Sequence, residues 1–260
     1  MFLALALLAA ALGDLPPDQL AAVARDAVNK QARLFDDIEK HCFVLRINQE
    51  GPGDDPKRKK ETRLEHVCFR DGVPVYKRLE INGRLTGVKL EDPFPPPNDE
   101  WRRRAERIRE ARKTQIDVIQ QCLHAFTFTY VTETVMEDRP VFVLDFAPNP
   151  NYKAVSRTTE MLKSARGRAW VDKETHNVVR VQAHTFKDFN IWGGLLAKIE
   201  EGATFEMRQR PVGGVWLAYR LDLNWEGRLA LVKRIGDKVH MERSDFKVGS
   251  ADAYGRKSAQ

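Results

Sequence analysis

Short segments rich in branched and aromatic residues, several of them alternating with polar positions, dominate the last third of the chain. They are separated by turns of about two to five residues that contain Gly, Asn or Asp, for example Glu226–Gly227 and Gly236–Asp237. Strands joined by turns this short pair as antiparallel neighbours. The pattern from Gly167 to Val248 therefore predicts a long antiparallel meander.

A similar pattern occupies the first third of the chain and recurs before the last third. The first meander is predicted to comprise Phe43–Ile47, Thr62–Phe69, Val73–Ile81 and Leu85–Leu90. A further hairpin is predicted from Phe126–Thr134 and Pro140–Phe146. All these segments together give about eleven strands.

Three other segments have the spacing of helices. The first starts at Leu15–Pro16–Pro17 and continues towards Leu34, and a short one is predicted at Val155–Ala165. The longest follows a proline-rich stretch and would run about 25 residues, or nearly 40 Å. Its apolar stripe, interrupted only by Arg112, consists of Trp101, Ala105, Ile108, Ile116, Ile119, Leu123 and Phe126.

These elements predict a β-dominated α+β fold. A sheet of about eleven strands must curl or split. We therefore expect a single strongly curved antiparallel sheet, an unclosed half-barrel, with two or three helices against its concave face. A closed lipocalin-type barrel is the alternative, and the long helix in the middle of the chain counts against it. No stretch resembles a linker, so residues 14–260 are predicted to form one domain with a disordered tail from about residue 249.

The first residues form an uncharged run rich in Leu and Ala. Residues 1–13 are too short to span a bilayer and have the length of a signal-peptide core, with small residues near a cleavage point before Asp14. No Lys or Arg precedes the run, so a misassigned start or a buried helical turn is the alternative. The signal peptide predicts a periplasmic or secreted protein.

Composition narrows the class of protein further. The 260 residues are 42% hydrophobic and 31% charged, with a net charge of +6, as in ordinary globular proteins. Much of the positive charge lies in Pro56–Lys60 and Trp101–Arg104, which we interpret as solvated surface. No aromatic and glycine pattern of an RNA-binding sheet accompanies them, so no nucleic-acid partner is predicted.

The chain has three cysteines. Cys42 and Cys68 are equally distant from residue 55, so they would face each other if the first two predicted strands pair. A disulfide there would contribute about 3 kcal/mol, and two reduced buried thiols are the alternative. Cys122 lies near the apolar face of the long helix and is expected to be a core residue.

The chain has no recognisable catalytic or metal-binding motif. The six histidines form no HExxH pattern, and CxxC, GxSxG and phosphate-binding glycine motifs are absent from the sequence. Asp145, Asp172 and Asp222 lie on predicted strands, but a single sequence does not show whether any two converge. We therefore predict no enzyme activity, no metal and no cofactor, with a hydrolase that uses a carboxylate pair as the least favoured alternative.

Several segments carry a resemblance to a known superfamily. They are Pro140–Pro148, Gly167–Lys173 with its G-x-x-W-V-D pattern, Val178–Val181, Lys198–Ala203 and Gly213–Leu217. In these segments the chain resembles the lipoprotein carriers LolA, LolB and the N-terminal domain of RseB. Within that superfamily it is most similar to bacterial outer-membrane lipoprotein-sorting proteins. The similarity extends from about Phe126 to Phe246, and Ala218 stands where the superfamily pattern has a proline.

The resemblance implies a curved sheet with helices as a lid over an apolar cavity that takes the acyl chain of a lipoprotein. It implies a lipid or acylated partner in the periplasm, outer-membrane biogenesis as the setting, and only transient contact with the membrane surface. The residues expected to line the cavity are Phe128, Tyr130, Phe142, Leu144, Trp170, Trp192, Leu195, Trp216 and Leu217. The alternative is an envelope sensor or scaffold that uses the same sheet to bind another protein.

Overall fold

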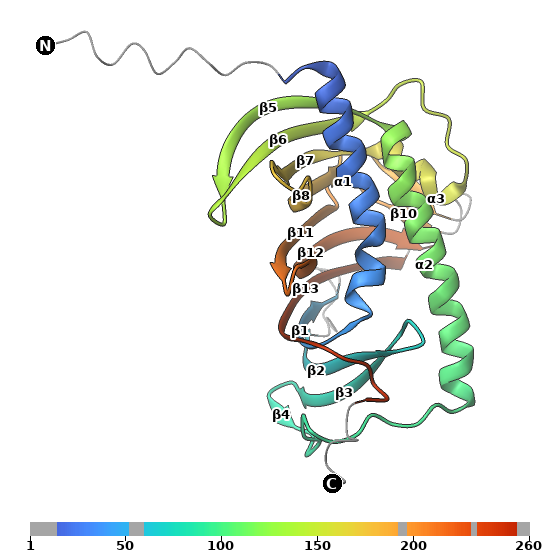
Figure 1. Ribbon diagram of the computed structural model, residues 1–260. Helices are drawn as coiled ribbons and strands as arrows, with labels where there is room; N and C mark the ends of the chain where they lie inside the picture. Colours follow the sequence, from blue (N-terminus) through green and yellow to red (C-terminus); the bar gives the residue numbers. More distant parts are fainter. Residues whose placement is uncertain (1–14, 52–59, 192–196, 230–232, 254–260) are drawn as a thin grey trace, which may run out of the picture.

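The computed structural model describes residues 15–51, 60–191, 197–229 and 233–253 (Figure 1). The predicted signal peptide, residues 1–13, lies outside the described residues, as do Trp192 and Leu195. None of the described helices is long and apolar enough to cross a membrane.

The described residues form one antiparallel sheet of 13 strands. Its first strands are β1 (His41–Glu50), β2 (Lys60–Arg70), β3 (Val73–Ile81), β4 (Arg84–Leu85), β5 (Phe126–Met136), β6 (Arg139–Pro148) and β7 (Ala165–Asp172). The others are β8 (Val178–Thr185), β9 (Phe189–Ile191), β10 (Ala197–Ile199), β11 (Thr204–Val212), β12 (Val215–Leu229) and β13 (Lys233–Val248).

The strand order is β4-β3-β2-β1-β13-β12-β11-β8-β7-β6-β5, with the short β9 and β10 attached to β12. The described strands β4 and β5 lie at the two ends of this order, so the sheet is curved but not closed into a barrel (Figure 1). The open half-barrel predicted from the sequence is thus confirmed. The first strand pairs with the last, His41 opposite Val248, and this pairing joins the two meanders.

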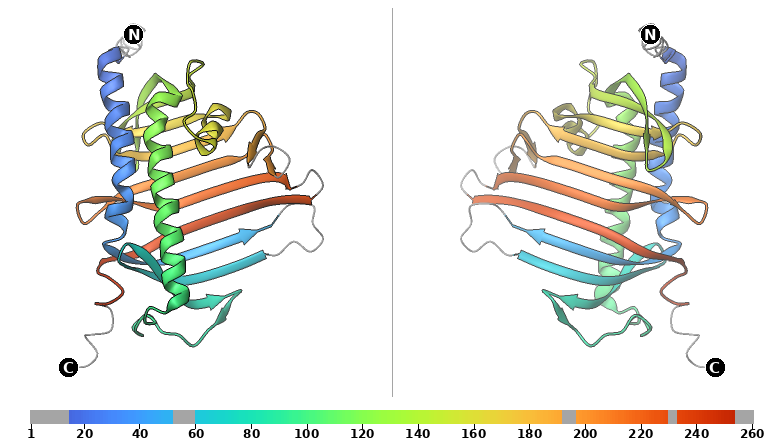
Figure 2. Two further views of the ribbon diagram at one scale, coloured as in Figure 1. Left: turned by 90° about the vertical axis from the view of Figure 1, so that its right-hand side faces the viewer. Right: turned by 90° about the vertical axis from the view of Figure 1, so that its left-hand side faces the viewer.

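Two long helices lie on one face of the sheet and cross its strands (Figure 2). Helix α1 (Pro17–Ile38) contacts β12 and β5, and α2 (Asp99–Ala125) contacts β3 and β5. Since β3 and β5 are near opposite ends of the strand order, α2 spans the concave side of the curved sheet. The two helices also contact each other, and Arg112 of α2 binds Asp36 and Glu39 of α1, with an N–O distance of 2.6 Å in each pair.

Two local predictions need correction, and one segment for which no strand was predicted forms two short strands. The predicted strand Leu85–Leu90 ends at Leu85, because the chain turns away at Gly87 (φ 83°) and the Lys77 ammonium, in β3, donates a hydrogen bond to the Leu90 carbonyl. The short helix predicted at Val155–Ala165 is a four-residue α3 (Arg157–Glu160) followed by a 3-10 helix, η1 (Met161–Ser164). Part of the apolar loop after residue 186 forms β9 and β10.

The chain remains attached to the sheet beyond β13. Ala251 is buried, its N–H donates to the Phe69 carbonyl, and Asp252 binds Arg70 with an N–O distance of 2.6 Å. The part of the predicted tail that the structure describes, residues 249–253, is therefore docked against β2.

Candidate functional site

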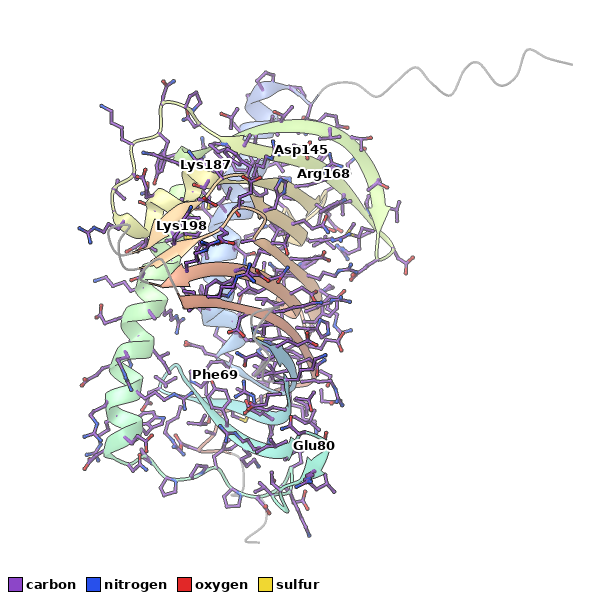
Figure 3. The ribbon with its side chains drawn as sticks, turned by 180° about the vertical axis from the view of Figure 1, so that it is seen from behind. Phe69, Glu80, Asp145, Arg168, Lys187 and Lys198 are labelled. Carbon is purple, nitrogen blue, oxygen red and sulfur yellow. A yellow bond between two sulfur atoms is a disulfide. The ribbon has the colours of Figure 1, made fainter. Side chains whose placement is uncertain are left out.

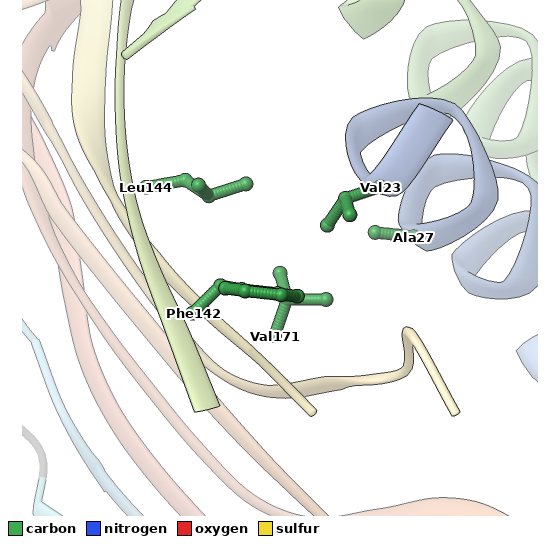
Figure 4. Close-up of a cluster of buried hydrophobic side chains, with 5 residues drawn as sticks. All are labelled: Val23, Ala27, Phe142, Leu144 and Val171. Atoms are coloured by element: carbon green, nitrogen blue, oxygen red, sulfur yellow. The ribbon is translucent and has the colours of Figure 1, made fainter. Parts of the chain in front are cut away.

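Helix α1 covers the concave face at the β5–β7 end of the sheet. Val23 and Ala27 of α1 pack against Phe142, Leu144 and Val171, and these five side chains form a buried cluster (Figure 4). Phe142 and Leu144 thus lie on the predicted face, and there they contact a helix of the same chain.

Four other residues were predicted to line the cavity, and two of them are on β5 and two on β12. The Tyr130 ring is edge-on to Phe142, with centroids 6.5 Å apart, and Phe128 packs beside Phe146 near the end of α2. Trp216 is half-buried and carries the Arg139 guanidinium 5.3 Å from its ring centroid. Leu217 is fully buried.

Trp170 lies on the opposite, convex face. It follows Ala169 and precedes Val171, which both pack against the α1 cluster, and side chains alternate between the faces of a strand. Its ring contacts the Arg180 guanidinium 4.9 Å from the centroid, and Trp170 borders a surface hollow that also contains Asp145 and Arg168. Trp170 therefore lies on the face opposite to that of Phe142 and Leu144.

A second apolar part of the concave face is less completely covered. We call it the concave strip, and its members are the half-buried residues Phe205, Leu221, Leu223, Trp225 and Met241 of β11, β12 and β13. Leu223 and Met241 border a buried cluster formed by Phe43, Leu45, Ile47, Val67 and Val239. The strip was not predictable from the sequence, because period-two patterning does not show which residues a helix leaves exposed.

Contacts of α1 explain why the strip stays exposed. Gln31 of α1 makes two hydrogen bonds with β11: its side-chain N–H donates to the Met207 sulfur at 3.7 Å, and its amide oxygen accepts from the Gln209 amide. Phe205 lies two residues earlier on the same face, about 7 Å away. On β12, Leu221 lies opposite Met207, which contacts α1. Leu223 and Trp225 follow on the same face, with Trp225 opposite Asp237 of β13, so the strip continues along β12 away from that contact.

The convex face is polar and its charges are paired. Arg168 donates two hydrogen bonds to Asp145, at 2.6 and 2.9 Å, from a neighbouring strand (Figure 3). Burial alone would raise the pKa of Glu206, but hydrogen bonds from Arg180, Arg208 and Gln182 outweigh it and lower the pKa to about 2.

The three aspartates considered as hydrolase candidates are all ion-paired: Asp145 with Arg168, Asp172 with Arg139, and Asp222 with Arg220. Burial tends to raise the pKa of Asp172 and of Asp222, but hydrogen bonds from these arginines help to outweigh it, and both pKa values are lowered. A carboxyl group with a lowered pKa is a poor general acid, so their environment does not support the hydrolase alternative.

Two surface hollows lie away from the concave strip. One, of about 490 Å³, is on the convex face and includes Asp145, Arg168 and Trp170. The other, of about 540 Å³, lies between the end of α2 and the chain around Tyr152. The first contains the Asp145–Arg168 ion pair and the second is lined mainly by polar side chains, so neither matches an acyl ligand.

Cys42 and Cys68 form a disulfide, and this confirms the pairing considered from the sequence. Their sulfurs lie within 4.8 Å of a His66 ring nitrogen, a grouping that could otherwise bind a metal. Thiolates are the metal-binding form of cysteine, and the disulfide removes them. Burial, with the nearby Lys77, lowers the pKa of His66 to about 4.

Neither a protein-family model nor a curated protein matches the chain. Among solved structures, it is similar to a DUF1329 family protein from Desulfovibrio piger (14% identity, 92% of this chain and 98% of the other, TM-score 0.33). It is also similar to a putative outer membrane lipoprotein-sorting protein domain from Vibrio parahaemolyticus (10%, 86% and 92%, TM-score 0.32). A third is a LolA superfamily protein from Nitrosomonas europaea (9%, 90% and 98%, TM-score 0.29).

These neighbours thus include the two groups that the sequence motifs resemble, the LolA superfamily and the lipoprotein-sorting proteins.

Proposed function

We propose that this protein is a periplasmic binding or carrier protein that takes a lipid or the acyl chain of a lipoprotein against the concave face of its sheet. The single observation that supports it most is the concave strip, an apolar surface on the inner side of the sheet that α1 leaves half-exposed. Each CH₂ group buried there would contribute about 0.8 kcal/mol, enough for reversible binding of a long chain.

The first experiment is mass spectrometry of an organic extract of the protein purified from its native envelope. A stoichiometric lipid or acylated peptide would support the carrier function and name the class of ligand. A clean extract, followed by no uptake of a fluorescent fatty acid, would overturn it.

A pair of variants on β12 tests the location of the site. Leu223→Asp places a carboxylate in the concave strip, and Asn224→Asp places one on the exposed opposite face, one residue away. We expect Leu223→Asp to weaken fatty-acid uptake about tenfold or more, because burying an unpaired carboxylate is costly. Asn224→Asp should leave uptake unchanged, and circular dichroism should show that both variants are folded. Equal uptake by both would exclude the strip as the site.

A protein-binding sensor or scaffold is the second candidate, and strand β5 favours it. This strand lies at the end of the described strand order, and Val131 and Val135 in it are exposed, at 41% and 68%. An edge strand can accept a further strand from a partner. A partner that is recovered by pull-down and lost in a Val131→Pro variant, together with a clean lipid extract, would establish this role in place of the carrier function.

A further inference from the structure

The concave face contains a half-buried arginine, Arg243, with no carboxylate partner among the described residues. Arg243 is on β13 directly opposite Leu45, on the face that also carries Met241. One guanidinium nitrogen, Nη1, donates to the Ala218 carbonyl at 2.9 Å, and the buried Nε has no hydrogen-bond partner. The guanidinium also lies 5.5 Å from the centroid of the Phe43 ring.

Several other charged groups on the sheet, unlike Arg243, have a partner of opposite charge. Glu65 is 4% exposed and lies 3.3 Å from the Arg78 guanidinium, and the fully buried Asp172 binds Arg139. Arg180 also has a buried Nε without a hydrogen bond, but its Nη2 donates to Glu206. A buried charge without a partner is destabilising, so the exception at Arg243 needs an explanation.

Two further groups lie beside Arg243. Tyr76 is packed against the same cluster as Phe43, and the exposed Arg104 of α2 lies 4.8 Å from the centroid of its ring. Burial raises the pKa of Tyr76, and both guanidiniums, Arg104 and Arg243, act in the opposite direction. Neither arginine has a carboxylate partner among the described residues. Glu65, which also faces this corner and acts to raise the Tyr76 pKa, is paired with Arg78, so the corner keeps an excess of positive charge.

The positive corner is continuous with the concave strip. Along β13, Arg243 is followed on the same face by Met241 and Val239, and β12 places Leu221, Leu223 and then Trp225 beside them. The distance from Arg243 to the pair formed by Trp225 and Asp237 is six residues, or about 20 Å of extended strand. This is comparable with the length of a long acyl chain.

We propose that Arg243, with Arg104 and the Tyr76 hydroxyl, forms a subsite for the anionic head group of a single-chain amphiphile whose chain lies along the concave strip. A carboxylate or phosphate there would supply the counter-ion that Arg243 lacks, and the guanidinium can donate two parallel hydrogen bonds to either group. This inference rests on the proposed carrier function and specifies the chemistry of its ligand.

The test compares ligands of one chain length with and without charge. Dodecanoate, dodecyl phosphate and dodecanol would each compete with a neutral fluorescent probe, N-phenylnaphthylamine, bound to the full-length protein. We expect the two anions to bind about tenfold or more tighter than dodecanol, the range of a charge-assisted hydrogen bond. Acetate and inorganic phosphate should not compete, since they lack the chain.

Variants test whether the preference for anions over dodecanol arises at the proposed subsite. Arg243→Met should bind the three ligands equally, with its affinity for dodecanol kept, and Arg220→Met on the convex face should retain the preference for anions. Because Arg243 is half-buried within the fold, Arg104→Met on the exposed side of α2 provides a second test that does not depend on the folding of Arg243→Met. It should lose part of the preference, about threefold.

The outcomes separate the subsite from the carrier function. Equal binding of dodecanoate and dodecanol to the unmodified protein would overturn the subsite and leave the carrier function standing. Absence of binding by all three would overturn both. Competition by acetate or phosphate alone would replace the amphiphile with a small anion.

Discussion

Cys42 and Cys68 join adjacent strands through a disulfide, and Cys122 remains a free thiol in α2. We expect Cys68→Ser to lower the free energy of unfolding by about 3 kcal/mol, because the bond closes a loop of about 25 residues in the unfolded chain. Chemical denaturation measures the change. Cys122→Ser is the control and should cost much less, and an equal loss in both variants would contradict the entropic account.

Glu206 is the clearest source of pH dependence. Its folded pKa of about 2 is below the ordinary value of 4.5, so its ion pairs stabilise the fold above pH 4.5 and lose this contribution as the pH falls towards 2. Glu206→Gln should therefore cost about 1–3 kcal/mol at pH 7, and the difference from the unmodified protein should shrink below pH 4.5. Thermal unfolding across this range measures it. The exposed Glu226→Gln should change little, and a difference that stays constant down to pH 2 would contradict the prediction.

At the scale of single residues, the alternation of side chains along a strand could be predicted from the sequence. Contacts between residues that are distant in the chain could not. Phe142 and Leu144 were placed on the helix-covered face because they share a phase of β6. Trp170 was misplaced, since a strand with large apolar side chains on both faces gives no sign of which face a helix covers. Arg243 was missed for a related reason: its burial comes from Phe43 and Tyr76, which are distant in the sequence.

At the scale of elements, the close packing of β7 against β8 explains why glycine occupies the first position of the G-x-x-W-V-D pattern. A Cβ built on Gly167 would lie 2.0 Å from the Gln182 carbonyl oxygen and 2.9 Å from the Ala183 Cα in β8. We expect Gly167→Ala to destabilise the protein by about 2 kcal/mol or more, because backbone atoms must move apart. Its melting temperature would show this, with the neighbouring exposed Arg166→Ala as control. A melting temperature equal to that of the control would show that the strands separate easily at this point.

The long helix predicted after the proline-rich stretch is α2, and the interruption of its apolar stripe at Arg112 has a structural cause. Its N-cap, Asn98, accepts a hydrogen bond from the Trp101 N–H, a role that asparagine commonly has at this position. Arg112, which interrupts the apolar stripe, faces Asp36 and Glu39 of α1 rather than an apolar surface. The sequence of α2 alone could not reveal this, because the partner carboxylates lie more than 70 residues earlier.

For the whole molecule, strand order predicts a gradient of stability. Strands β1, β13, β12 and β11 each pair on both sides, whereas the described β4 and β5 are at the ends of the order. We expect amide hydrogen exchange to be slowest in the central strands and fastest in β4 and β5, because end strands open locally at little cost. Mass-spectrometric exchange of the native protein measures this, and slowest exchange in β5 would contradict it.

The curved open sheet and the helices on its concave side were predictable at this scale, because strand count, short turns and one long helix allow few architectures. The pairing of the first strand with the last was not, since nothing in the local pattern of either β1 or β13 specifies a distant partner.

That pairing has a consequence for biosynthesis. The partner of β1 is translated roughly 190 residues after it, which at about 5–20 residues per second is a delay of some ten to forty seconds. During this interval the N-terminal meander has one edge without its native neighbour and can pair with the same edge of another nascent chain. The sheet is completed only after β13 has left the ribosome, so the pairing of β1 with β13 is a late step in the folding of this protein.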